Sequence, residues 1–230
     1  AKVVRPVLSR VTSMPIADEK VAESEESFYQ RLEGNREILA DPEVTSTRLV
    51  MNPEKMVISE ARRTYTNLGL FGYAVDAAIV NRVLPESVTD PYFARWREIQ
   101  QTHLDDVAAG FADTEVMHLR LFDEEMVGVD RLRVVGRELY GERDPAERLA
   151  QGRPFRVEDE EDSVALVIAV PFAEKGEIDV MRYGDELVLT VGSYRRAFVL
   201  PDSLKRRQVT RAHLAGGDLR VVFGEVDGAA

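Results

Sequence analysis

Two polar side chains, each following a short apolar run, are the residues best suited to bind a small molecule. Asn81 follows residues 75–80, and its amide offers one acceptor and two donors that can match the N6 donor and N7 acceptor of adenine. Glu54 follows the run at residues 48–51, and its carboxylate can accept a ribose hydroxyl. Asn is also a common turn or cap residue, and a helix dipole favours Glu in a first turn, so structural roles stay open for both.

A strand, a crossover helix and a second strand must position these residues. Residues 47–51 and 75–81 are predicted strands, and the helix between them is predicted to have Asn52 as N-cap, to begin at Pro53 and to end near Gly69. Such a unit makes parallel strands, and ligands bind outside the carboxyl ends of strands in these sheets. The sequence therefore predicts a small-molecule site at that edge. The expected buried stripe of the helix is Val57, Ala61, Thr64 and Leu68.

Composition restricts the classes of function. The chain has 230 residues, 44% of them hydrophobic, and a net charge of -11, which argues against nucleic acid or an anionic membrane as a partner. No apolar stretch approaches the ~20 residues of a membrane span, and no signal peptide opens the chain, so a cytoplasmic protein without stable membrane insertion is expected. With no Cys and three His, neither a metal centre nor a thiol site for arsenite is expected.

The remaining segments before Pro154 are predicted mainly as helices. The pattern predicts helices over residues 18–40, from Pro91 to Gly110, and up to Gly141, with a third strand at residues 116–121. Asp144 begins a capping-box pattern that predicts a further short helix, and residues 151–154 resemble a linker. Tyr92, Trp96 and His103 share one face of the helix from Pro91 to Gly110, and we interpret this face as packed against the rest of the protein.

Beyond Pro154 the apolar period changes to two, which predicts a small antiparallel β-sandwich. The acidic run at residues 158–162 is interpreted as a solvated loop, and the pairs Arg62-Arg63 and Arg195-Arg196 as surface ion pairs. The predicted strands are residues 163–170, 178–183, 186–191, 194–200, 209–214 and 219–223.

Several motifs together resemble the arsenical-pump ATPase family, which includes the tail-anchored-protein targeting ATPases. They are R-L-V-M-N-P-E-K-M-V-I-S-E-A-R-R, V-D-A-A-I-V-N-R-V-L-P, W-R-E-I-Q-Q and E-M-V-G, within residues 18–141. The resemblance implies that residues 1–152 are the carboxyl-terminal part of an α/β, deviant P-loop ATPase domain. It also implies a nucleotide-bridged homodimer and ATP with Mg as cofactor in the complete protein.

The resemblance also assigns roles to residues. Asn81 matches the family's adenine-reading Asn, with Arg82 beside it, and Glu54 matches a nucleotide-contacting Glu. The segment that begins with Arg120, Leu121 and Phe122 matches the adenine-side loop, where Arg120 stands in place of the usual Pro.

No catalytic residue is assigned in this chain. The family's P-loop, catalytic Asp and switch segments lie upstream of the matched region, and the 230 residues contain neither G-x-x-x-x-G-K-[ST] nor G-x-G-x-x-G. The chain also opens at Ala1 without an initiator Met, which suggests processing or a piece of a longer protein. We therefore expect no ATP hydrolysis by this chain alone.

Residues 153–230 resemble the alpha-crystallin-like (small heat-shock) domain appended to some bacterial members. V-A-L-V-I-A-V-P-F and G-D-E-L-V-L-T-V-G carry this resemblance. Such a sandwich can hold apolar segments by strand addition, or it can be a structural cap. The expected function is the adenine side of an ATP-hydrolysing protein that handles a hydrophobic or membrane-protein client. The alternative is a non-enzymatic interaction or chaperone module.

Overall fold

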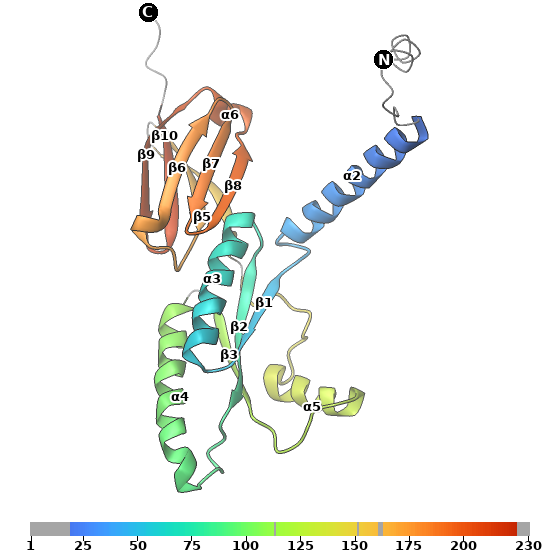
Figure 1. Ribbon diagram of the computed structural model, residues 1–230, viewed down its shortest axis with the longest axis vertical. Helices are drawn as coiled ribbons and strands as arrows, with labels where there is room; N and C mark the ends of the chain where they lie inside the picture. Colours follow the sequence, from blue (N-terminus) through green and yellow to red (C-terminus); the bar gives the residue numbers. More distant parts are fainter. Residues whose placement is uncertain (1–18, 113, 151, 161–162, 225–230) are drawn as a thin grey trace, which may run out of the picture.

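The computed structural model describes residues 19–112, 114–150, 152–160 and 163–224, with side chains from residue 24 onward. Figure 1 shows an α/β part, a β-sandwich beside it, and the helix α2 (Glu19–Ala40), which projects away from both. The predicted fold class, α/β followed by an antiparallel sandwich, is confirmed. None of the described helices is long and apolar enough to cross a membrane.

A three-stranded parallel sheet forms the centre of the α/β part, in the order β1-β2-β3. Its strands are β1 (Thr47–Met51), β2 (Val75–Val83) and β3 (Glu115–Arg120). The central strand β2 is buried from Val75 to Val80, as a parallel strand covered on both faces should be. The covering helices are α3 (Lys55–Phe71), α4 (Pro91–Gly110) and α5 (Val129–Tyr140).

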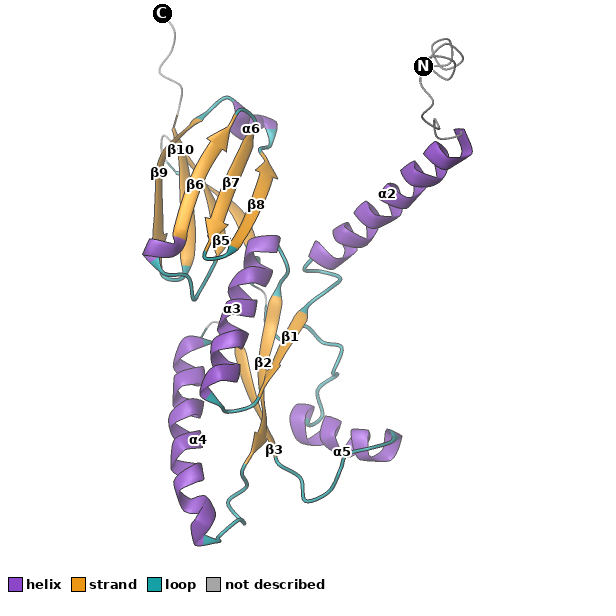
Figure 2. Ribbon diagram, viewed as in Figure 1, coloured by secondary structure: helices purple, strands orange, loops and turns teal. Residues whose placement is uncertain are grey.

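Helices cover both faces of this sheet (Figure 2), and each face has its own apolar core. Ile58 of α3 and Val107 of α4 pack on the face that presents Ala78 and Val80. Val135 and Leu139 of α5 pack on the opposite face, which presents among others Ala77, Ile79, Met117 and Leu119. The sheet is therefore a middle layer, and its carboxyl edge lies between the helices of the two faces.

Helix α3 begins later than the sequence predicts, and its predicted buried stripe is confirmed at three of four residues. Glu54, not Asn52, is the N-cap, because the Glu54 N–H bonds the Asn52 carbonyl oxygen at 2.8 Å and residues 52–54 make a turn. At the other end the helix continues to Phe71, and Gly72 caps it at φ 87°. Of the predicted stripe, Ala61 is buried and Val57 and Leu68 are partly buried against the same core, whereas Thr64 is exposed. The other buried residues of the helix are Ile58, Thr66, Gly69 and Leu70. Burial extends to Leu70 because the last turn of α3 packs on the sandwich as well as the sheet.

One further prediction about helices is wrong, and another is confirmed only in part. Within the described part of the chain, residues 144–147 form a turn and no helix, in which the Asp144 carboxylate accepts the Ala146 N–H at 2.8 Å. Tyr92 and Trp96 of α4 are 73% and 51% exposed, so the first half of that face does not pack as interpreted, whereas His103 is half-buried and Val107 is fully buried. Figure 2 shows the reason: the first half of α4 extends beyond the end of the sheet.

The sandwich consists of two antiparallel sheets, β4-β5-β10-β9 and β6-β7-β8. The first contains β4 (Phe155–Asp159), β5 (Ser163–Ala169), β9 (Gln208–Ala215) and β10 (Asp218–Gly224). The second contains β6 (Ile178–Tyr183), β7 (Glu186–Val191) and β8 (Tyr194–Val199). A single 3-10 turn η1 (Lys175–Glu177) precedes β6, and a short helix α6 (Asp202–Lys205) follows β8.

The acidic run at residues 158–162 is not simply a solvated loop. Glu158 lies on β4, which the sequence did not predict, and pairs with Arg156 at 2.6 Å and Arg220 at 2.7 Å. Glu160 also pairs with Arg220, at 3.0 Å. These ion pairs link β4 to β10 across the intervening strand β5. Residues 161 and 162 lie outside the described residues.

The α/β part and the sandwich exchange side chains where they meet. Leu70 of α3 has no exposed area and belongs to the apolar core of the sandwich. Phe172, which follows β5, packs in the opposite direction against the α/β core, with ring centroids 4.9 Å from Phe111 and 5.8 Å from Tyr65. Gly69 lies so close to β5 that a Cβ there would be 2.2 Å from the Ala169 carbonyl oxygen. Neither core is complete without a residue from the other part.

Arg196 joins the same two parts and is not the surface ion pair that the sequence suggested. Its guanidinium lies over the rings of Phe198, at 4.3 Å, and Phe155, at 4.9 Å, and donates to the Leu70 carbonyl oxygen at 2.5 Å. Burial lowers the pKa of Arg196 to about 10, so the group stays charged near neutral pH. Aromatic faces and a helix C-terminal carbonyl therefore balance this charge.

Candidate functional site

A pocket of about 710 Å³ lies at the carboxyl ends of β2 and β3. Five of the six residues predicted from the sequence line this pocket: Asn81, Arg82, Arg120, Leu121 and Phe122. Its wall is completed by Leu119, residues 123–127, and Leu132 and Val135 of α5. The pocket therefore lies where the direction of the parallel strands predicts a ligand, at the carboxyl edge of the sheet.

A β-bulge near the end of β2 places Asn81 in this pocket. Val80 pairs with His118 and Val83 with Arg120, so Asn81 and Arg82 together oppose one residue of β3. Arg82 has φ 61°, the left-handed region that a non-glycine residue seldom occupies. The backbone is thus locally strained at the residue that follows the candidate base-reading side chain.

The bulge also orients the Asn81 amide. The Arg82 N–H donates to Asn81 Oδ1 at 2.9 Å, which identifies the oxygen side of the amide. One Oδ1 lone pair remains, and no described residue accepts a hydrogen bond from Nδ2. The free groups form the acceptor and donor pair that the N6 donor and N7 acceptor of adenine require.

The pocket wall is apolar on the side of α5, and Arg120 holds the Phe122 ring of this wall in place. Leu119 is buried, while Phe122 and Val135 are partly exposed and line the pocket. The Arg120 guanidinium lies 4.7 Å from the centroid of the Phe122 ring and bonds Glu138 of α5 at 2.9 Å. With its charge paired, Arg120 holds Phe122 and α5 together and is no free anion-binding group.

The rim of the pocket is acidic. Asp123, Glu124 and Glu125 are exposed along it, and only Glu124 has an ion-pair partner among the described residues, Arg131 at 2.7 Å. Carboxylates repel phosphate groups, whereas an uncharged base with apolar faces suits the Asn81 amide and the Phe122 ring. Arg82 also lines the pocket, but Asp123 and Glu125 have no ion-pair partner among the described residues, so the lining suits the base of a nucleotide better than its triphosphate.

Glu54 is not brought together with the other predicted residues. It is exposed at the end of β1, on the same edge of the sheet, but does not line the pocket. Its carbonyl oxygen accepts the Ile58 N–H as the first bond of α3, while its carboxylate makes no capping bond. A ligand contact by Glu54 stays a prediction.

Gln100 of α4 supports the site and was not among the residues predicted from the sequence. Its side-chain amide bonds the backbone on both sides of Val83, directly after the bulge. The sequence indicates this role only weakly. Gln100 is a polar residue on the helical face whose later residues, Leu104, Val107 and Phe111, pack in the core.

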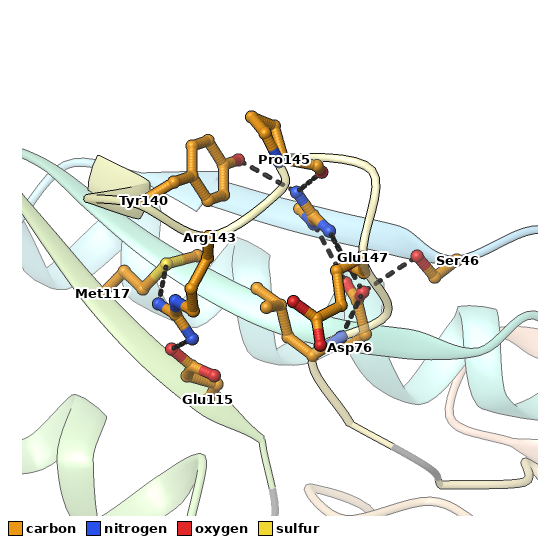
Figure 3. Close-up of polar contacts among 10 residues, drawn as sticks. Ser46, Asp76, Glu115, Met117, Tyr140, Arg143, Pro145 and Glu147 are labelled. Atoms are coloured by element: carbon orange, nitrogen blue, oxygen red, sulfur yellow. Dashed lines mark hydrogen bonds and ion pairs between the residues drawn. The ribbon is translucent and has the colours of Figure 1, made fainter. Parts of the chain in front are cut away.

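The most connected polar cluster, at the amino edge of the sheet, is structural (Figure 3). Asp76 is 1% exposed and accepts bonds from Ser46 Oγ at 2.9 Å and the Leu149 N–H at 3.1 Å. Arg48 binds this carboxylate at 3.3 Å and also donates to the carbonyl oxygens of Pro145 and Glu147, both at 2.6 Å. These bonds tie residues 145–149 to the sheet and explain why that segment turns and forms no helix.

Comparisons with known proteins agree with the order of the two parts predicted from the sequence. The sequence model of the anion-transporting ATPase family matches residues 1–141, and that of the HSP20-like domain found in ArsA matches residues 161–223. A relative from Aquifex aeolicus, named arsenical pump-driving ATPase 1, is 34% identical over 224 residues, which cover 96% of this chain and 57% of the relative.

Two further relatives extend this picture. An arsenical pump-driving ATPase, so named, from Chlorobaculum tepidum is 35% identical over 208 residues, 88% of this chain and 51% of the relative. The ATPase GET3C of Arabidopsis thaliana is 30% identical over 116 residues, 48% of this chain and 29% of the relative. The chain thus spans about half the length of the bacterial relatives, 57% and 51%.

Proposed function

Because the chain belongs to the anion-transporting ATPase family, we propose that it supplies the adenine side of a nucleotide site in an ATP-binding and ATP-hydrolysing protein. Asn81 reads the base, and Phe122 and Leu121 enclose it beside Arg82 and Arg120. Glu54 is assigned to the ribose hydroxyl from the sequence, since it lies outside the described pocket. The observation that carries the proposal is the gathering of five predicted residues around one pocket, with the Asn81 amide free on the side that adenine needs.

In this proposal, the residues of this chain bind the base of the nucleotide, and residues outside it bind the phosphates. The described pocket has an acidic rim and the 230 residues contain no P-loop motif, so we assign the phosphates and Mg to groups outside these residues. In this proposal the chain alone does not turn over ATP. Its complete form works in the cytoplasm as a nucleotide-bridged homodimer, with a hydrophobic or membrane-protein client.

A second role, binding a client or partner, is proposed for the sandwich, with a boundary between residues 152 and 153. Edge strands β4 and β8 expose Val157 by 55% and Val199 by 73%, and an edge strand can accept an added strand from another chain. The same observation and the HSP20-like match support the alternative, a non-enzymatic interaction or chaperone module. Nucleoside binding at Asn81 discriminates between the two functions.

The base-reading proposal is tested by titrating the isotope-labelled chain with adenosine, which lacks phosphates and needs only the groups present here. Adenosine should shift the Asn81 side-chain amide signals in NMR spectra. Asn81→Ala should weaken binding about tenfold, since it removes two hydrogen bonds. Guanosine should bind less well, because its O6 acceptor would oppose the fixed Oδ1.

Asn35→Ala, which removes an exposed amide on α2, is the matched control and should bind adenosine as the unaltered chain does. Equal affinity of the Asn81→Ala chain, or shifts confined to residues outside the pocket, would refute the assignment of Asn81.

A further inference from the structure

Gln100 pairs with the backbone of β2 in the way that a neighbouring strand would. Its Oε1 accepts the Leu84 N–H at 2.9 Å, and its Nε2 donates to the Arg82 carbonyl oxygen at 3.4 Å. A single side-chain amide therefore bonds the peptide groups on both sides of Val83. This contact joins α4 to a strand whose regular pairing with β3 has just been interrupted.

The opposite side of the same short segment is held by β3. The Val83 carbonyl oxygen accepts the Leu121 N–H at 2.8 Å, and Val83 pairs with Arg120. Residues 82–84 are thus fixed between Gln100 and the first residues of the pocket loop. Asn81 and Arg82 have no strand partner among the described residues, so their placement depends on this anchored segment and on Val80 before them.

The strained residue lies between Gln100 and Asn81. Arg82 adopts φ 61°, and a non-glycine residue keeps such a conformation only where its surroundings fix it. Its carbonyl oxygen accepts the bond from Gln100, and its N–H donates to Asn81 Oδ1 at 2.9 Å. The two peptide groups of Arg82 therefore connect the helix side chain to the amide in the pocket.

We infer that Gln100 is a positioning residue for Asn81: it holds the left-handed Arg82 so that the Asn81 amide presents its free acceptor and donor to the base. Gln100 does not line the pocket and touches no ligand in this scheme. The inference deepens the proposed function and rests on it for the identity of the base.

Gln100→Met tests this inference, because Met keeps the length of the side chain and its helical preference but loses both hydrogen bonds. Gln101→Met is the matched control, since the next residue along α4 is exposed and its Nε2 bonds only Asp105, at 2.9 Å. Gln100→Glu keeps an acceptor for the Leu84 N–H but has no donor for the Arg82 carbonyl oxygen. The uncharged adenosine is used again as the probe, so the added charge does not act on the ligand directly.

Gln100→Met should weaken adenosine binding about five- to tenfold, the loss expected when one or two hydrogen bonds no longer hold the reading group. The Gln100→Glu chain should fall between that variant and the unaltered chain, and the Gln101→Met chain should bind normally. In the absence of adenosine, Gln100→Met should speed the hydrogen exchange of the Arg82 and Leu84 amides and move the Asn81 side-chain signals.

Unchanged adenosine affinity in the Gln100→Met chain would overturn the inference, as would unchanged Arg82 exchange and Asn81 signals in its ligand-free spectrum. Failure of the unaltered chain to bind adenosine would overturn the proposed function and the base-reading part of the inference with it. The positioning part is judged separately, because the ligand-free spectra report the placement of Asn81 without any nucleoside.

Discussion

Gly69→Ala should destabilise this protein, although the same substitution inside a helix normally stabilises it. The added Cβ would lie 2.2 Å from the Ala169 carbonyl oxygen, where contacts below 3.0 Å force something to move. The helix backbone fixes the position of the Cβ, and the Ala169 oxygen belongs to the backbone of β5, so no side-chain rotation relieves the contact. Helix α3 and strand β5 must separate by roughly 1 Å, which also loosens the packing around Leu70.

The magnitude follows from two opposing effects. Replacing Gly by Ala in a helix gains about 1 kcal/mol from backbone preference. Forcing extra volume into a packed contact costs typically about 1–3 kcal/mol, with more possible where only backbone can yield. Because only backbone can yield at this contact, the cost should lie at the upper end of that range, about 2–3 kcal/mol. The net loss should therefore be about 1–2 kcal/mol, which for a chain of this size lowers the unfolding midpoint by roughly 2–8 °C.

Gly136→Ala on α5 is the matched control, because a Cβ at that position meets nothing within 4 Å. It should gain about 1 kcal/mol, so the two variants should differ by about 2–3 kcal/mol. Urea denaturation followed by circular dichroism measures the difference, provided that the slope m stays the same in both variants.

A Gly69→Ala chain as stable as the Gly136→Ala chain, with an unchanged m value, would show that α3 and β5 do not approach each other so closely in solution. Loss of stability in both variants would instead mean that the effect comes from the helices themselves. Only opposite signs support the packed contact between α3 and the sandwich.

Two further predictions concern charge. Arg48→Met leaves Asp76, 1% exposed, without its cation and should cost about 3–5 kcal/mol in urea denaturation; a loss below about 1 kcal/mol would contradict the buried pair. Hydrogen bonds from Arg156 and Arg220 lower the pKa of Glu158, and those from Arg220 and Ser163 lower the pKa of Glu160, from the ordinary value of 4.5. Because the folded-state pKa values are depressed, this stabilisation is present above about pH 4.5 and is lost as the pH falls through the lower folded values. The thermal midpoint of a Glu158→Gln, Glu160→Gln chain should therefore depend less on pH below 4.5, and an equally steep dependence would refute the role of the two carboxylates.

The sequence predicts the features of the site that depend on local pattern. An apolar run ending in Asn81 identifies a buried strand and the residue at its carboxyl end, and parallel connection brings the ends of β2 and β3 to one edge. The bulge at Asn81 and Arg82 has no such signal, because neither residue is a glycine that would mark a positive φ. Only the register between the two strands reveals it.

Contacts between segments far apart in the sequence also escaped prediction, but for a different reason. The aromatic surroundings of Arg196 come from α3, β4 and β8, and nothing in the Arg195-Arg196 pair tells which of the two side chains turns inward. Gln100 is similar, because its partners on β2 are fixed by the way α4 lies along the sheet. Tertiary placement decides the role of both residues, while local pattern decides only the element that carries them.

The exchange of Leu70 and Phe172 between the two cores limits how these parts can be recombined. If this sandwich were moved to another protein without α3, its core would lack the Leu70 side chain. The α/β part left behind would expose Leu70 to water. A working chimera must therefore transfer the last turn of α3 together with the sandwich, or redesign both surfaces as a matched set. The same restriction applies during evolution. Substitutions at Gly69, Leu70 and Phe172 should therefore occur only together with compensating substitutions at the residues that they contact in the other part.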